Sequence, residues 1–229
     1  MATLTDDEFG EIVVRKVATS RHIRLSVAPD GRLRASMPSI ASMSSLKKMI
    51  QKSREQIRAM LEEHAPDTIY EDGTRVGKSH TVLVTHGAKT KVSRQKLKLC
   101  VTLAPGRQID ESDIQALIRK EVRAALRVEA KHYLPRRLAV LADRIDCQYE
   151  KVRFSHASSR WGSCSSSGTI SLNIALMQLP FELIDYVLMH ELSHTKQMNH
   201  SAAFWELVAA ADSEYLAHRR QLKKFHPTI

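Results

Sequence analysis

Apolar positions recur with two different periods along this chain, and each change of period marks a new element. Alternation of apolar and polar residues, which is typical of a strand with one buried face, occurs three times before residue 40, over residues 11–18, 22–28 and 32–37. The sequence Pro29-Asp30-Gly31 predicts a turn between the second and third strands, because Pro fixes φ and Gly supplies a positive φ. From Met43 to Glu63 the period is helical. We expect a three-stranded meander followed by one helix.

The pattern changes from strands to helices near residue 106. Residues 65–106 are rich in turns and β-like, with a hairpin signal at Asp72-Gly73, and Pro105-Gly106 closes the segment. Residues 110–146 then follow a helical period, with Asp110 as a candidate N-cap and Pro135 as a kink or as the start of a second helix. We therefore place a domain boundary here, between a β-rich region 1–106 and a second domain 107–229.

The second domain continues with short elements around one helix. Residues 149–154 and 169–174 are predicted strands, joined by a polar turn over 158–168. Pro180 is well placed to begin a helix. The buried stripe of that helix has helical spacing and consists of Phe181, Ile184, Leu188 and Leu192. Two further helices are predicted, one capped by Ser201 and one by Ser213.

Composition limits the class of protein. The chain has 229 residues, of which 43% are apolar, and this suffices for a sizeable core. No apolar run approaches the ~18 residues of a membrane-spanning helix. Residues 1–9 lack the basic start and apolar core of a signal peptide, and three scattered cysteines form no disulfide framework. We expect a cytoplasmic protein with no membrane partner.

Charge adds nucleic acid as a candidate partner. The net charge is +10, and residues 11–60 carry eleven Lys or Arg against three acids. A basic N-terminal region of this kind attracts polyanions. No pattern of stacking aromatic residues accompanies the charge, so the segment does not resemble a nucleic-acid-binding module. The competing interpretation is a solvated basic face without a partner.

The sequence His190-Glu191-Leu192-Ser193-His194 contains the residues with the most specific chemistry. Positions i and i+4 of a helix share a face, so both imidazoles can bind one metal ion. Glu191 is then placed to take a proton from a water molecule at that metal. A catalytic zinc ion takes three protein ligands and keeps one position open. The motif therefore predicts a zinc-dependent hydrolase, and specifically a peptidase.

Three residues compete for the role of third ligand. We favour His200, because imidazole suits zinc and six residues are enough for a turn that returns to the ion. Glu206 and Glu214, from a later helix, are the alternatives. The pattern H-E-x-x-H-x-x-G-x-x-H ends its helix with a Gly, and this chain has Gln197 there. We expect Asn199, which tolerates a left-handed conformation, to end the helix instead.

Other polar residues are candidates for supporting roles. Arg160 and Tyr215 could hold the negative charge that develops on the scissile carbonyl oxygen, and the sequence does not choose between them. We expect Trp161, Gly162 and Cys164 to be structural: a packing ring, a turn and a buried thiol. A metal-binding latch by Cys164 is the less favoured alternative.

Several segments form a set that can be compared with known families. They are Arg21-His22-Ile23-Arg24-Leu25, Arg160-Trp161-Gly162-Ser163-Cys164, Leu172-Asn173, Ile184-Asp185-Tyr186-Val187, the His190 to His194 motif, Asn199-His200-Ser201 and Phe204-Trp205. This set resembles the YgjP-like metallopeptidases, which are related to the SprT-like and WLM peptidases. The resemblance spans roughly residues 11–222.

The resemblance implies a fold, a cofactor and a set of site residues. The fold is α+β, with a zincin-like catalytic domain (an active-site helix plus a small sheet) preceded by a β-rich N-terminal region with one helix. The cofactor is one Zn²⁺, held by His190, His194 and His200. Glu191 is implied to be the catalytic residue.

Three functions are consistent with these observations. The first is a zinc metallopeptidase acting on a peptide or protein substrate. The second is a nucleic-acid-associated protease, by analogy with SprT-like relatives that act on proteins attached to DNA. The third is a non-catalytic zinc-binding scaffold protein. Glu191 argues against the third function, because a structural zinc site needs no base and usually closes its fourth position.

Overall fold

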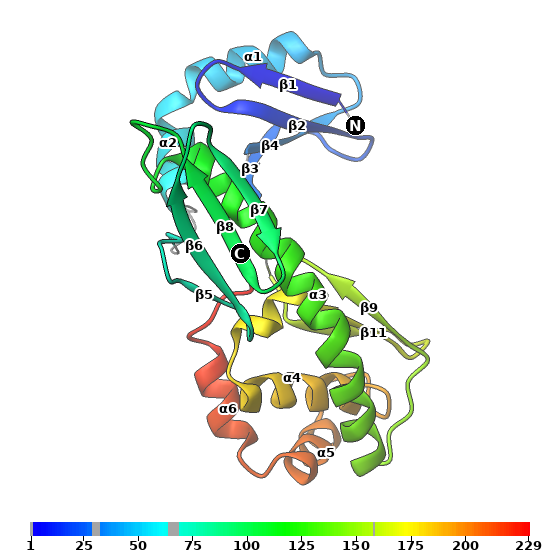
Figure 1. Cartoon of the computed structure of the whole chain (residues 1–229). Helices are drawn as coiled ribbons and strands as arrows, with labels where there is room; N and C mark the ends of the chain where they lie inside the picture. The colour runs from blue at the N-terminus through cyan, green and yellow to red at the C-terminus, as the bar shows by residue number, and fades with distance from the viewer. Residues whose placement is uncertain (1, 29–32, 64–68, 158) are drawn as a thin grey trace. The chain divides into compact units, whose positions relative to one another are not determined.

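Helices and small mixed sheets alternate along the chain, which confirms the predicted α+β class (Figure 1). The computed structural model describes residues 2–28, 33–63, 69–157 and 159–229. Contacts divide the chain into Met1–Thr68, called here the N-terminal unit, and Ile69–Ile229, the C-terminal unit. The predicted turn Pro29-Asp30-Gly31 lies outside the described residues. Among the described helices, none combines the length and the apolarity that spanning a bilayer requires.

The N-terminal unit is a four-stranded sheet with two helices. Its elements are β1 (Ala2–Asp6), β2 (Gly10–Val17), β3 (Arg24–Val27), β4 (Leu33–Pro38), α1 (Met43–Lys52) and α2 (Arg54–Glu63). The spatial order is β1-β2-β4-β3, and β2 runs parallel to β4. The predicted meander is therefore wrong, because β3 pairs with the far side of β4 instead of with β2. Local alternation identifies a strand but not its neighbour.

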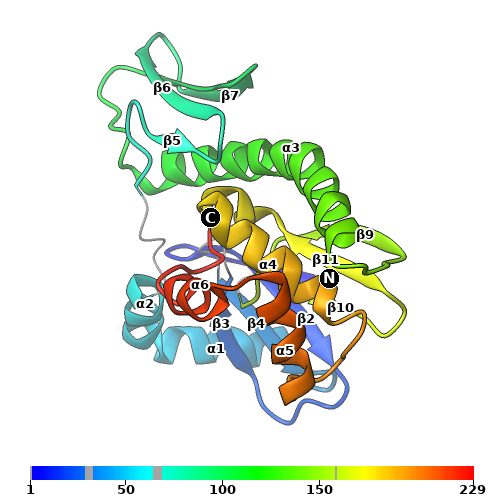
Figure 2. The same cartoon turned by 90° about the horizontal axis from the view of Figure 1, so that it is seen from below.

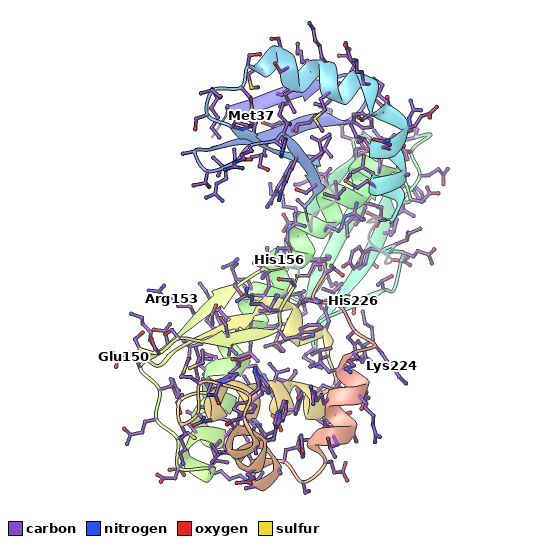
Figure 3. The ribbon with its side chains drawn as sticks, turned by 180° about the vertical axis from the view of Figure 1, so that it is seen from behind. Met37, Glu150, Arg153, His156, Lys224 and His226 are labelled. Atoms are coloured by element: carbon purple, nitrogen blue, oxygen red, sulfur yellow. The ribbon has the colours of Figure 1, made fainter. Side chains whose placement is uncertain are left out.

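One face of this sheet is buried against the helices. The core consists mainly of Ile12, Val14, Leu33, Ala35 and Met37 from the sheet and Leu46, Ile50 and Ile57 from the helices. Met37, labelled in Figure 3, lies on β4 and is fully buried. The single helix predicted over 43–63 is divided at Ser53, whose backbone N–H bonds to the carbonyl groups of Met49 and Ile50.

The C-terminal unit is organised along the long helix α3 (Ser112–Arg144). A second sheet, in the order β5-β6-β8-β7, packs against it. Its strands are β5 (Arg75–Val76), β6 (His80–His86), β7 (Lys91–Gln95) and β8 (Lys98–Leu103). This sheet shares its core with α3, so the two units divide at residue 68. We had placed a domain boundary at residue 106. That 1–106 and 107–229 are the functional domains stays a prediction.

Helix α3 differs from its prediction at its start, where Glu111 takes the N-cap position that we assigned to Asp110. Of the two alternatives for Pro135, the structure has the kink: the residue lies inside the helix, which continues to Arg144. Figure 2 shows α3 bending along its length, as expected where a proline removes one backbone hydrogen bond.

The remaining elements form a small sheet and a group of helices (Figure 2). They are β9 (Lys151–Ser155), β10 (Gly162–Cys164), β11 (Thr169–Asn173), the 3₁₀ helix η1 (Ile174–Gln178), α4 (Phe181–Ser193), α5 (Ala202–Ala211) and α6 (Tyr215–Leu222). The sheet order is β10-β11-β9, with β9 parallel to β11 and β10 antiparallel at the edge. Strand β10 falls within the segment predicted as a polar turn, so the prediction was wrong there. Ser201 takes the N-cap position of α5 as predicted, whereas Glu214, not Ser213, precedes α6.

Candidate metal centre

Helix α4 presents the motif at its C-terminal end. Its buried residues include Leu183, Ile184, Val187, Leu188 and Leu192, which fix the helix in the core. Phe181, predicted in the buried stripe, is exposed at the start of the helix instead. His190 and Glu191 lie in the last turn, and His194 is the C-cap residue with a helical backbone (φ −66°, ψ −19°). The i and i+4 spacing therefore holds, and both imidazoles project from one side of the helix end.

Three imidazoles meet beside this helix end. His190, His194 and His200, called here the histidine cluster, each offer one ligand atom within 4.8 Å of the others. Nε2 of His190 lies 3.2 Å from Nε2 of His200. Two nitrogens bound to one tetrahedral zinc at bonds of about 2.0–2.1 Å would lie about 3.3 Å apart. The cluster therefore fits a single metal ion of that size.

The cluster also bears on the choice of third ligand. Within the described part of the chain, it is the group of His, Cys, Asp and Glu side chains that could hold a metal. Neither Glu206 nor Glu214 belongs to it. The Glu214 side chain is 75% exposed and lies 4.0 Å from Nε2 of His218.

Contacts outside the cluster orient its rings. Nδ1 of His194 lies 3.1 Å from the carbonyl oxygen of Gln197. When Nδ1–H donates to this oxygen, the lone pair of Nε2 is left for a metal, as is usual for metal-binding histidines. Phe204 is fully buried and contacts all three imidazoles, with ring centroids 4.9, 4.5 and 4.7 Å from those of His190, His194 and His200. Phe204 thus forms the apolar support on which the cluster rests.

Side-chain hydrogen bonds stabilise the turn that brings His200 back to the other two histidines. Nε2 of Gln197 donates to Oδ1 of Asn199 (2.8 Å) and to Oγ of Ser201 (3.2 Å), and Oδ1 of Asn199 also accepts from the backbone N–H of Ser201 (3.3 Å). Among the described non-glycine residues, positive φ occurs at Lys96 and Asp146. The expectation of a left-handed Asn199 was therefore wrong. A network of amide and hydroxyl groups closes the turn where a glycine would otherwise be needed.

His190 and His194 are held in their neutral form. Burial, then the neighbouring His194 and His200, and then the Arg219 guanidinium lower the pKa of His190 to about 3. Burial also lowers the pKa of His194. A neutral imidazole is the form that binds a metal, because its second nitrogen keeps a lone pair. The environment therefore favours ligation over protonation near neutral pH.

Glu191 lies beside the cluster in a narrow space between α4 and β10. Its side chain is 5% exposed, and Oε2 has no hydrogen-bond partner among the described residues. Burial raises the pKa of Glu191 to about 8, against the opposing charge of Arg160. A Cβ atom at Gly162 would lie only 2.6 Å from Oε1 of Glu191. We predicted that Gly162 makes a turn, but it lies in a strand, and its lack of a side chain makes room for the carboxyl group.

Cys164 lies two positions after Gly162 on the same strand. Its Sγ lies 3.4 Å from the carbonyl oxygen of Ser165, and the thiol is not part of the candidate metal group. Burial, reinforced by the charge of Glu191, raises the pKa of the Cys164 thiol. Since the thiolate is the form that binds a metal, this environment disfavours the latch.

A small cavity opens next to Glu191. Its volume is about 180 Å³, and it is lined by Trp161, Gly162, Tyr186, Val187, His190, Glu191 and Leu222. Arg160 is exposed, and its charge acts on Glu191 from the β10 side. Tyr215 stacks on Trp205, with ring centroids 5.8 Å apart and an interplanar angle of 22°. That either residue stabilises an oxyanion stays a prediction.

Asn173 is a positioning residue whose role the sequence did not reveal. It is fully buried, and its Nδ2 donates to the carbonyl oxygens of Ala157 (2.6 Å) and Arg160 (3.0 Å). Its Oδ1 accepts from the backbone N–H of Ala175 (3.0 Å). Asn173 therefore fixes the segment that leads into β10. The sequence pattern placed Asn173 at the end of a predicted strand. A pattern of this kind does not indicate hydrogen bonds to residues as distant as Ala157 and Arg160.

Comparisons with known proteins identify a family for this chain. The model of the family described as YgjP-like, metallopeptidase domain, matches residues 21–225. Among solved structures, the chain is similar to the metallopeptidase zymogen abylysin of Pyrococcus abyssi, with 28% sequence identity and a TM-score of 0.36. That match covers 40% of this chain and 93% of the abylysin chain. No curated protein matches.

Proposed function

Because the chain belongs to the YgjP-like metallopeptidase family, we propose that it is a zinc-dependent peptidase whose histidine cluster holds the metal and whose Glu191 is the general base. The observation that carries this proposal is the meeting of three imidazoles beside a buried carboxyl group. The substrate is a peptide or protein, as for a metallopeptidase in general. A scaffold role would not require a buried carboxyl group or a cavity beside the metal ligands.

The donor set suits zinc. Three neutral imidazoles are a known ligand set of catalytic zinc ions, which keep a fourth position for water or substrate. The carbonyl oxygen of Gln197 fixes the His194 ring in the orientation that ligation needs. When bound, zinc supplies Lewis-acid chemistry: it polarises the scissile carbonyl group and makes a water molecule acidic enough to lose its proton near neutral pH.

The protein supplies the proton transfers. The charge of a zinc ion held by the histidine cluster would favour the ionised form of the Glu191 carboxyl group, which burial alone disfavours. As a carboxylate, Glu191 would accept the proton of the attacking water and pass it to the nitrogen of the leaving amine. Gly162 allows the carboxyl group to reach this position, because any side chain there would occupy the same space. Arg160, on the β10 side of Glu191, and Tyr215, stacked on Trp205, are the candidates for stabilising the developing oxyanion.

Removal of the metal tests the proposal as a whole. The chain should bind about one zinc ion, lose peptide hydrolysis in the presence of a chelator and regain it when zinc is added. Zinc should also raise the melting temperature, because a ligand that binds only the folded state stabilises it. Metal analysis, calorimetry and cleavage of a mixed peptide pool measure these effects. Full hydrolysis by the chelated protein would refute the proposal.

Binding of nucleic acid is a second candidate function, favoured by one face of the N-terminal unit. Arg15, Arg24 and Arg34 alternate with core residues, so they lie on the sheet face opposite the helices. Ser36 pairs with both Arg15 and Arg24, which places the arginines on three adjoining strands. All three are exposed, and none belongs to an ion pair of the described residues. We call this set the arginine face.

A pair of matched triple variants tests whether this face binds nucleic acid. Replacing Arg15, Arg24 and Arg34 by Gln should weaken binding of a labelled oligonucleotide and reduce the slope of log K against log salt by about 2 to 3. The control replaces Lys47, Lys48 and Lys52 of α1 by Gln, which removes the same charge from another surface. Fluorescence anisotropy measures both. Equal losses in the two variants, or no binding at low salt, would exclude the arginine face.

A further inference from the structure

A cation that has no ion-pair partner among the described residues lies close to the histidine cluster, on a helix outside the motif. Cζ of Arg219, on α6, lies 4.4 Å from the ring centroid of Trp205. The Trp205 ring in turn stacks on His200 (5.7 Å, 28°) and lies 5.9 Å from the His190 ring. A guanidinium group over an indole face is held by a cation–π interaction. Trp205 therefore positions the charge of Arg219 beside the cluster.

The electrostatics agree with this placement. The charge of Arg219 contributes to lowering the pKa of His190. It also lowers the pKa of Tyr186, against the larger opposing effect of burial. Because such effects fall with distance, the guanidinium acts on both residues from nearby.

Within the part of the chain that the structure describes, no acid neutralises this charge. Of the carboxylates near α6, Asp212 lies 2.7 Å from Nδ1 of His218, and Glu214 approaches the same ring. Among the described residues, Arg219 takes part in no ion pair, whereas Arg54, Arg107 and Arg137 each contact carboxylates. The five N–H donors of Arg219 are thus available while its position is fixed.

One face of α6 carries both Arg219 and a residue that lines the cavity beside Glu191. Leu222 lies one helical turn after Arg219, so the two share a face of α6. Leu222 and Tyr186 line the cavity together with His190 and Glu191. A substrate side chain that enters this cavity would therefore bring its neighbouring groups within reach of α6.

We propose that Arg219 determines specificity by binding a carboxylate of the peptide substrate next to the scissile bond. Two sources share this chemistry: an acidic side chain and the C-terminal carboxylate. The planar guanidinium binds either one through two parallel hydrogen bonds, and stacking on Trp205 orients it in advance. This inference rests on the proposed peptidase function. By binding the carboxylate, Arg219 acts on substrate choice and not on the proton transfers.

Matched peptides test the inference on the full-length, zinc-loaded protein. The series compares Glu, Gln and Lys at each position flanking one cleavage site, and a free C-terminus with an amide. The wild type should prefer one carboxylate-bearing peptide by about tenfold to a hundredfold in kcat/KM, mostly through KM. Arg219→Gln should remove the preference, and Arg219→Glu should shift it to Lys. The control Arg220→Gln removes the same charge from the adjacent position and should retain the wild-type peptide preference.

Binding measurements separate this inference from the proposed function. The same labelled peptides are titrated into zinc-loaded Glu191→Gln protein, with and without Arg219→Gln, and affinity is read by anisotropy. If no peptide is cleaved but the preference persists in binding, the peptidase proposal fails and the carboxylate site stands. If protein with Arg219 intact distinguishes neither Glu from Gln nor a free C-terminus from an amide, in cleavage or in binding, the inference is overturned. It is also overturned by an Arg219→Gln variant whose kcat falls equally on all peptides, since that result assigns Arg219 to the oxyanion.

Discussion

Replacement of Glu191 by Gln should abolish peptide hydrolysis while leaving zinc bound. Gln has the shape of Glu but cannot accept the proton of the attacking water. Loss of a general base costs about a hundredfold to ten-thousandfold in rate. The three histidines are untouched, so metal content should remain about one zinc per chain. Hydrolysis of a peptide pool and elemental analysis of the same preparation measure the two effects together.

The protein should tolerate this substitution well. Oε2 of Glu191 has no hydrogen-bond partner among the described residues, and the amide fills the same space against Gly162. Glu182→Gln is the matched control, because Glu182 is exposed in the first turn of the same helix. It should keep both zinc and activity. Undiminished cleavage by Glu191→Gln would remove Glu191 from the mechanism.

Replacement of His200 by Ala should lower zinc affinity at least about a hundredfold, because even loss of a residue that only orients a ligand costs about tenfold to a hundredfold. His200 is exposed and follows the helix, so its loss should hardly affect folding in the absence of metal. Competition with a chromogenic chelator measures the affinity. Activity should fall in parallel at limiting zinc and recover in part at high zinc.

His132→Ala is the control for His200→Ala, since His132 is exposed on α3 and outside the cluster. It should bind zinc as the wild type does. An unchanged zinc affinity in His200→Ala would transfer the third ligand to Glu206 or Glu214. Glu206→Gln and Glu214→Gln would then decide between them by the same competition assay.

Sequence periodicity predicted most elements but not their neighbours. Three of the four strands of the N-terminal unit were located and β1 was missed, and β2 pairs with β4 and not with β3. Strand β10 was missed because three residues, Gly162, Ser163 and Cys164, carry no apolar alternation. Such a strand is defined by its pairing with β11, which is a contact between residues distant in sequence. The sheet of residues 75–103 shares a hydrophobic core with α3, and this long-range contact was not predicted either.

The local sequence was enough to predict the positions of the helical histidines, Glu191 and His200, because these positions depend on local geometry. Helical spacing places His190 and His194 on one face, and Glu191 follows the first ligand at once. The short distance to His200 made it the favoured third ligand, and the structure brings it to the other two. Imidazole and carboxyl chemistry then indicated zinc and hydrolysis.

Only the tertiary structure decided what surrounds that motif. The fit of Glu191 against Gly162, the support of the cluster by Phe204 and the placement of Arg219 over Trp205 each join residues from different elements. No periodicity encodes such contacts, because they depend on how the sheet and helices pack together. The sequence by itself therefore determined the spacing of the histidines and Glu191 and predicted their chemistry. Folding determined the cavity and the position of Arg219 over Trp205, because these arise from long-range packing.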